Sequence, residues 1–144
     1  MANQGDFYQK FREEMREWLM SNTGKNHKFA EYLMFGPDLF HLLCKLSFDK
    51  DVPVAEKAKL AGTIAYFVSP LDLVPEALTG PLGYVDDIAL SAYVLNGIIN
   101  NTGAEIVQKH WAGDEDVLNV IQQILKVADE MVGSGLWNKL KAMF

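Results

Sequence analysis

Apolar residues recur at helical spacing along most of the chain, and no stretch alternates as a half-buried strand would. The first stripe predicts a helix over residues 6–22; its members are Phe7, Phe11, Met15, Trp18 and Leu19. Turn-forming residues at Gly36-Pro37 and over 49–53 separate the helices that follow. We therefore expect an all-α fold.

The segment over about residues 86–100 is apolar on almost every side. A helix of this kind is buried by its neighbours on most sides. It predicts a compact, orthogonal or irregular bundle of about six or seven helices, with this segment at the centre. The last helices are expected over 102–144, where the residues from Thr102 to Glu105 have the pattern of a capping box.

Length and composition fit one helical domain over residues 1–144, with 49% hydrophobic and 11% aromatic residues. The longest strongly apolar runs without a charge, 60–71 and 88–99, have twelve residues each, whereas a membrane-spanning helix needs ~20. No transmembrane span is expected. A net charge of −6 without a cluster of Lys or Arg argues against a nucleic-acid partner.

The distribution of charge singles out one region. Between Leu60 and Ala104 there is no Lys or Arg, and the charged residues are all carboxylates: Asp72, Glu76, Asp86 and Asp87. An acid in such apolar surroundings must be neutralised, hydrogen-bonded or paired. The region therefore contains the candidate site.

We prefer the interpretation that these acids cap helices, with Asp72 after Ser69-Pro70 and Asp86 or Asp87 before the central helix. A second interpretation makes the same residues (Asp72, Glu76, Asp86, Asp87) the ligands of Mg²⁺, Mn²⁺ or Ca²⁺, which prefer oxygen donors. A third uses two of the carboxylates as general acid and base. Nothing in the sequence identifies a nucleophile or a phosphate-binding loop.

The same region carries a longer motif. The residues Pro70-Leu71-Asp72-Leu73-Val74-Pro75-Glu76, followed by Gly83-Tyr84-Val85-Asp86-Asp87, resemble the YkvA-like family, and the resemblance extends over about 37–100. It implies a small bacterial helical domain of unassigned function. The family usually has Asp where this chain has Glu76, a difference that would alter tight metal geometry.

Three features lie outside that motif. Cys44 stands in an apolar run and is expected to be a packed thiol. His41 is expected on the wetter face of its helix, and His110 near a helix C-terminus, where a histidine interacts with the helix dipole. The segment Leu136–Phe144 is a short basic amphipath that either packs on the bundle, as we expect, or lies on an anionic membrane.

The sequence favours a non-enzymatic helical interaction module, cytoplasmic and with an unidentified protein partner. A peripheral contact with a membrane through Leu136–Phe144 is left open. The alternative is a divalent-metal-binding helical protein, and such a protein could be an enzyme. Excess Mg²⁺, Mn²⁺ or Ca²⁺ against EDTA would separate the two hypotheses in a thermal-unfolding measurement.

Overall fold

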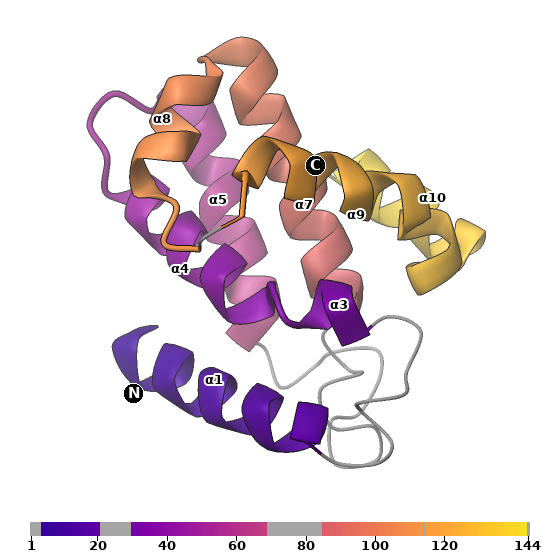
Figure 1. Ribbon diagram of the computed structural model, residues 1–144. Helices are drawn as coiled ribbons and strands as arrows, with labels where there is room; N and C mark the ends of the chain where they lie inside the picture. Colours follow the sequence, from indigo (N-terminus) through magenta and orange to yellow (C-terminus); the bar gives the residue numbers. More distant parts are fainter. Residues whose placement is uncertain (1–3, 21–29, 69–84, 114, 144) are drawn as a thin grey trace.

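The computed structural model describes residues 4–20, 30–68, 85–113 and 115–143 (Figure 1). These residues form α-helices and turns without a strand, which confirms the all-α prediction. The helices are α1 (Gln4–Met20), α3 (Ala30–Leu33), α4 (Gly36–Ser47), α5 (Val54–Val68), α7 (Val85–Asn101), α8 (Ala104–His110), α9 (Val117–Val132) and α10 (Ser134–Met143).

Helix α7 is the centre of the described bundle, as its sequence predicts. It packs against α3, α4, α5, α8, α9 and α10, which surround it (Figure 1). Its fully buried apolar side chains come from several sides of the helix: Ile88, Ala89, Leu90, Ala92, Leu95 and Ile98. A helix enclosed in this way has no polar face to turn to solvent, and this explains its unusual composition.

Helix α4 forms the second layer of the core. Pro37 stands in its first turn, where a missing backbone N–H costs nothing. The helix buries one continuous face against α1, α5, α7 and α8; the apolar members of that face are Leu39, Phe40, Leu42, Leu43 and Leu46. The half-buried His41 lies beyond the edge of this face, with its ring centroid 5.2 Å from that of Tyr8 on α1. His41 therefore lies on the less buried side of α4, as expected, with α1 partly covering it.

Helix α1 docks on α4 through a close approach at Gly36. Phe11 and Met15 of the predicted N-terminal stripe are buried there. A Cβ atom added at Gly36 would lie 2.8 Å from Cζ of Phe11 and 3.3 Å from Cδ1 of Ile88. Glycine is therefore required where α1, α4 and α7 meet.

Replacing Gly36 with alanine should destabilise the protein by about 1–3 kcal/mol, because the added Cβ would force the buried Phe11 ring to shift within the core. Urea unfolding followed by circular dichroism measures the change. The matched control is Gly97→Ala in α7, where an added Cβ has no atom within 4 Å. That variant should gain about 0.5–1 kcal/mol from better helix propensity. Equal effects at the two sites would contradict the packing argument.

The junction of α7 and α8 differs from the predicted capping box. The N-cap of α8 is Gly103, with φ 125° and no side-chain cap bond. Its N–H donates to the carbonyls of Ile98 and Ile99, so this residue also closes the end of α7. The buried Thr102 hydroxyl has no hydrogen-bond partner among the described residues. Thr102 belongs to the end of α7, because its N–H donates to the carbonyl of Ile98. The N-cap position of α8 therefore falls on Gly103, which has no side chain to form a cap bond.

The C-terminal helices close the other side of α7. Asp116 caps α9, its carboxylate accepting a hydrogen bond of 3.1 Å from the N–H of Leu118. In α10, Trp137 and Leu140 are buried, and the Trp137 ring meets that of Tyr93 edge to face at 5.9 Å. The terminal amphipath thus packs on the bundle, as we expected. Among the described residues, no helix combines the length and the apolar character needed to cross a bilayer.

Candidate functional site

The predicted carboxylates are described only in part. Asp72 and Glu76 lie outside the described residues, as does the side chain of Asp86. Helix α7 begins at Val85, so Asp86 and Asp87 belong to its first turn rather than preceding it. The Asp87 side chain is fully buried, and its backbone carbonyl accepts a bond of 2.8 Å from the Ser91 hydroxyl. The described ranges contain no group of three or more His, Cys, Asp or Glu placed to hold a metal ion.

A second polar site, which the sequence did not reveal, lies at the turn between α4 and α5. Helix α4 ends as the Ser47 hydroxyl donates to the carbonyl of Cys44 at 2.7 Å. The N–H of Asp51 then donates to Oδ1 of Asp49 at 2.8 Å, which makes an Asx turn. The N–H of Val52 donates to the Asp49 carbonyl at 3.2 Å. Local hydrogen bonds therefore define the path of the chain through this turn.

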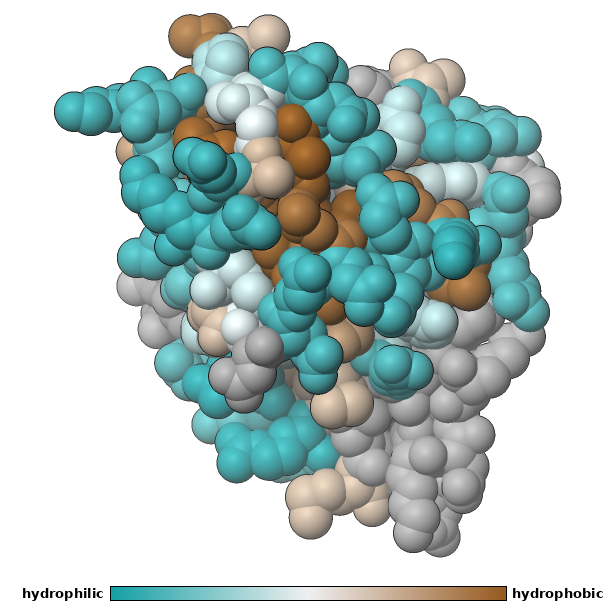
Figure 2. Space-filling model, turned by 45° about the horizontal axis from the view of Figure 1, so that its top comes forward, coloured by the Kyte–Doolittle hydropathy of each residue, from teal (hydrophilic) through white to brown (hydrophobic). Residues whose placement is uncertain are grey.

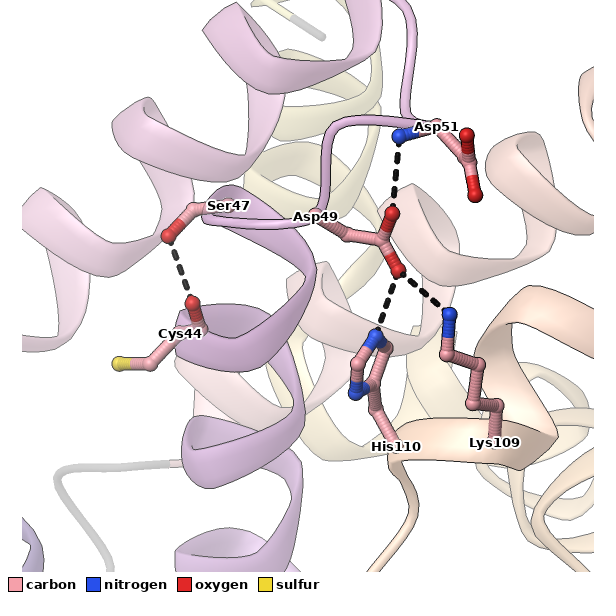
Figure 3. A network of polar contacts seen from close by, with 6 residues as sticks. All are labelled: Cys44, Ser47, Asp49, Asp51, Lys109 and His110. Carbon is pink, nitrogen blue, oxygen red and sulfur yellow. Dashed lines mark hydrogen bonds and ion pairs between the residues drawn. The ribbon is translucent and has the colours of Figure 1, made fainter.

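The Asp49 carboxylate also ties the turn to α8. Its Oδ2 lies 2.7 Å from Nε2 of His110 and 3.4 Å from Nζ of Lys109, the last two residues of that helix (Figure 3). The side chain of Asp49 is 5% exposed, whereas that of Lys109 is 59% exposed. We call these three residues the Asp49 network. It joins segments 60 residues apart in the sequence.

The Asp49 network keeps its carboxylate charged. The hydrogen bond from His110, followed by that from the Asp51 N–H, lowers the pKa of Asp49 from 3.8 to about 2. An ionised carboxylate only accepts hydrogen bonds, so Nε2 of His110 carries the shared proton. This arrangement orients the imidazole and leaves Oδ2 with two donors.

An oriented Asp–His pair would be catalytic if a nucleophile stood on the other side of the imidazole. Cys44 and Ser47 are the nearby nucleophile types, but Figure 3 shows their side chains on the opposite side of the turn, directed away from His110. The Ser47 hydroxyl is committed to a backbone carbonyl. Burial raises the pKa of the Cys44 thiol to about 11, so it stays protonated, as expected for a packed thiol. The geometry is that of a structural tie.

The depressed pKa of Asp49 predicts a defined loss of stability in acid. The contribution of this group is fully present above its ordinary pKa of 3.8 and is lost as the pH falls toward about 2. We expect the difference in melting temperature between the wild type and Asp49→Asn to shrink over that interval. The other carboxylates titrate in both proteins, so their effect cancels in the difference between the two melting temperatures. A difference that stays constant over this range would contradict the assignment.

A second buried acid links α5 to the end of α7. Glu56, in the first turn of α5, is 6% exposed, and its Oε1 accepts a hydrogen bond of 3.0 Å from Nδ2 of Asn101. Among the described residues, Oε2 of Glu56 has no hydrogen-bond partner. Two of the acids in the 49–56 segment therefore point into the protein.

Exposed apolar side chains lie next to these two buried acids: Phe48 directly precedes Asp49, and Val54 lies two residues before Glu56. Phe48 is 78% exposed and Val54 is 85% exposed. On the side of the molecule drawn in Figure 2, most of the described surface is hydrophilic. Apolar surface is confined there to a narrow band and a few projecting points. The other large apolar side chains exposed among the described residues are Met20 and Met34, which line an open cavity of about 400 Å³ between α1 and α4.

The sequence signals for this site were incomplete. The 49–53 segment reads as a turn, and His110 as the end of a helix, and both statements hold. Nothing in the sequence pairs residues that are 61 positions apart. One local signal was missed. An Asp in a turn can accept a hydrogen bond from the N–H two residues later, as Asp49 does from Asp51, and this is the pattern of an Asx turn.

Comparisons with known proteins found one family that matches part of the chain and two similar proteins. Residues 56–93 match a family described as a protein of unknown function (DUF1232). Over 130 residues the chain is 24% identical to an uncharacterised protein, ORF9, of Methanothermobacter thermautotrophicus, covering 90% of this chain and 84% of that protein. Over 29 residues it is 59% identical to the E3 ubiquitin-protein ligase RNF170 of Xenopus laevis, covering 20% of this chain and 11% of the ligase. No solved structure matches the chain significantly.

Proposed function

We propose that this protein is a non-enzymatic helical interaction module that binds its partner through the turn between α4 and α5. The observation that carries the proposal is the exposure of Phe48 and Val54 on a turn that the Asp49 network holds in place. Contiguous exposed apolar surface marks interaction sites on proteins, and we take Phe48 and Val54 together as such a surface. A surface that is ordered before binding loses less conformational entropy on association.

The proposal extends to family and location. The match over 56–93 lies inside the YkvA-like resemblance over 37–100, and we take both as one motif, that of a bacterial, cytoplasmic group of unassigned function. The relative from Methanothermobacter thermautotrophicus is uncharacterised, in agreement with an activity that has not been assigned. A membrane contact through Leu136–Phe144 would require α10 to release Trp137 and Leu140 from the core. For this reason the proposal uses the α4–α5 turn instead.

Site-specific photo-crosslinking tests the proposal. Benzoylphenylalanine in place of Phe48 preserves the aromatic character of an exposed position, and irradiation of cells producing the full chain should give a covalent adduct. The control places the same group at Met34, which is 57% exposed on another surface. Mass spectrometry detects adducts to protein and to lipid alike. Equal labelling at the two positions, or none at position 48, would reject this surface.

The divalent-metal hypothesis remains as a second candidate, favoured by one observation. Asp87 is a fully buried carboxylate in the first turn of α7, and it belongs to the motif that also contains Asp72, Glu76 and Asp86. Oxygen ligands from such residues suit Mg²⁺, Mn²⁺ or Ca²⁺.

The thermal-unfolding experiment decides this candidate. A bound ion at about 100 times its Kd should stabilise the protein by about 2.7 kcal/mol, and Asp72→Asn should abolish the gain. Asp116→Asn, which changes an acid outside the motif, should keep it. An identical melting temperature in EDTA and in each ion would remove the metal hypothesis.

A further inference from the structure

We propose that the partner of the α4–α5 turn is an anionic membrane surface, contacted through Phe48, Val54 and the lysines around them. This inference rests on the proposed function, because it names the partner of the same surface. We refer to the side chains of Phe48 and Val54 as the apolar tip. Figure 1 shows the turn at the outer edge of the bundle, beside α8.

The first support is the rigidity of the apolar tip. The N–H of Phe48 donates to the carbonyl of Lys45 at 3.3 Å, and the next residue is anchored to α8 by the Asp49 network. Val54 begins α5, and the N–H of Lys57 donates to the carbonyl of Pro53 at 3.0 Å. Both apolar side chains are thus fixed to helix ends but make few contacts of their own.

The second support is the sign of the charge around the tip. The residues from Lys45 to Lys57 comprise three lysines (Lys45, Lys50, Lys57) and three acids (Asp49, Asp51, Glu56), so the segment is neutral in sequence. Asp49 and Glu56 are buried, which leaves Asp51 as the exposed acid of the segment. Lys109 of α8 is paired with the ionised Asp49 at 3.4 Å, so these two charges offset each other and the charges that remain at the surface are those of the three lysines and Asp51. The outer face of the turn is therefore basic on a chain with a net charge of −6.

The third support is the shape of the surface. Phe48 and Val54 are 78% and 85% exposed, so both side chains stand out from the surface of the bundle. A projecting turn with an aromatic residue and surrounding lysines matches a lipid surface, where apolar groups enter the headgroup region and lysines meet anionic lipids.

Vesicle co-sedimentation with the full chain tests the inference. The probe is a vesicle of phosphatidylcholine with phosphatidylglycerol, compared with phosphatidylcholine alone. We expect binding to the anionic vesicles that weakens with added salt. Phe48→Ser with Val54→Ser should lower the partition coefficient about tenfold. Lys45→Gln, Lys50→Gln and Lys57→Gln together should lower it on the order of a hundredfold, about fivefold for each lysine.

The matched control removes two other exposed apolar side chains, with Met20→Ser and Met34→Ser, and should bind as the wild type does. The substituted residues at the turn are exposed except Lys57, which is half-buried, and unchanged circular dichroism spectra and melting temperatures verify that the variants fold. The inference would be overturned if the wild type did not bind anionic vesicles. It would also be overturned if the tip variant and the lysine variant bound them as strongly as the wild type does.

The remaining outcomes separate the inference from the proposed function. A protein adduct from position 48 without vesicle binding would retain the interaction module and reject the membrane as its partner. Sedimentation velocity covers the case of a second copy of the chain. If Phe48→Ser with Val54→Ser converted a dimer to a monomer and vesicles did not bind, the tip would be a self-association surface, and the membrane inference would fall.

Discussion

Asp49→Ala should lower the melting temperature of the protein by about 6–10 °C, although the substituted residue lies in a turn. The variant removes the acceptor for His110, Lys109 and the N–H of Asp51 together. The buried position cannot replace these bonds with water as an exposed one would, and the turn also loses its link to α8. Differential scanning calorimetry at neutral pH measures the change.

The control for this prediction is Asp51→Ala, which removes an exposed acid from the same turn and should change the melting temperature little. A double-mutant cycle with His110→Ala tests the cause. If the two side chains act through their 2.7 Å contact, the double variant should lose less than the sum of the single variants. Additive losses would show that Asp49 stabilises the turn without His110.

Phe40→Ala should cost about 3–5 kcal/mol of unfolding free energy, the largest effect we expect from a single substitution. Phe40 is fully buried on the inner face of α4, where the helix packs against α1, α5, α7 and α8. Removing its ring leaves a cavity that the surrounding helices cannot fill without moving. Guanidinium unfolding monitored by circular dichroism gives the free-energy difference.

Phe48→Ala provides a direct comparison, since it removes the same ring from the residue that ends the same helix. Phe48 is 78% exposed, so this variant should stay within about 0.5 kcal/mol of the wild type. A large loss for Phe48→Ala would show that the ring packs in solution and would remove the basis of the proposed binding surface. The pair therefore tests both the core and the proposed function.

The two phenylalanines also show what the fold implies for function. A protein of this size retains apolar residues at its surface, and single ones need no explanation. Phe48 and Val54 differ because Asp49, in the segment between them, and Glu56, just after that segment, are buried, whereas Lys45 and Lys50 are exposed. One turn thus carries both a structural contact and the proposed binding surface: Asp49 stabilises the fold through His110 and Lys109, beside the exposed Phe48.

Several elements could be predicted because their signals are local. The apolar stripe with Phe11 and Met15 predicted α1, and Pro37 predicted the start of α4. The uniform composition around Ile88 and Leu95 predicted a central helix. Thr102 was misinterpreted because its pattern fits a cap, whereas the conformation of Gly103 gives that position to the end of α7. Helical spacing also placed His41 on the less buried side of α4, but it does not show that Tyr8 of α1 lies against the imidazole.

The sequence by itself determined the all-α class and the position of the central helix, because helical periodicity and uniform burial are properties of neighbouring residues. It also located the acidic motif of Asp72, Glu76, Asp86 and Asp87 without settling its chemistry. Only the tertiary structure decided that Asp49 meets His110 and Lys109, and that Glu56 meets Asn101. Those contacts depend on how α4, α5, α7 and α8 pack, and packing is set by the summed burial of many side chains, which no local pattern contains.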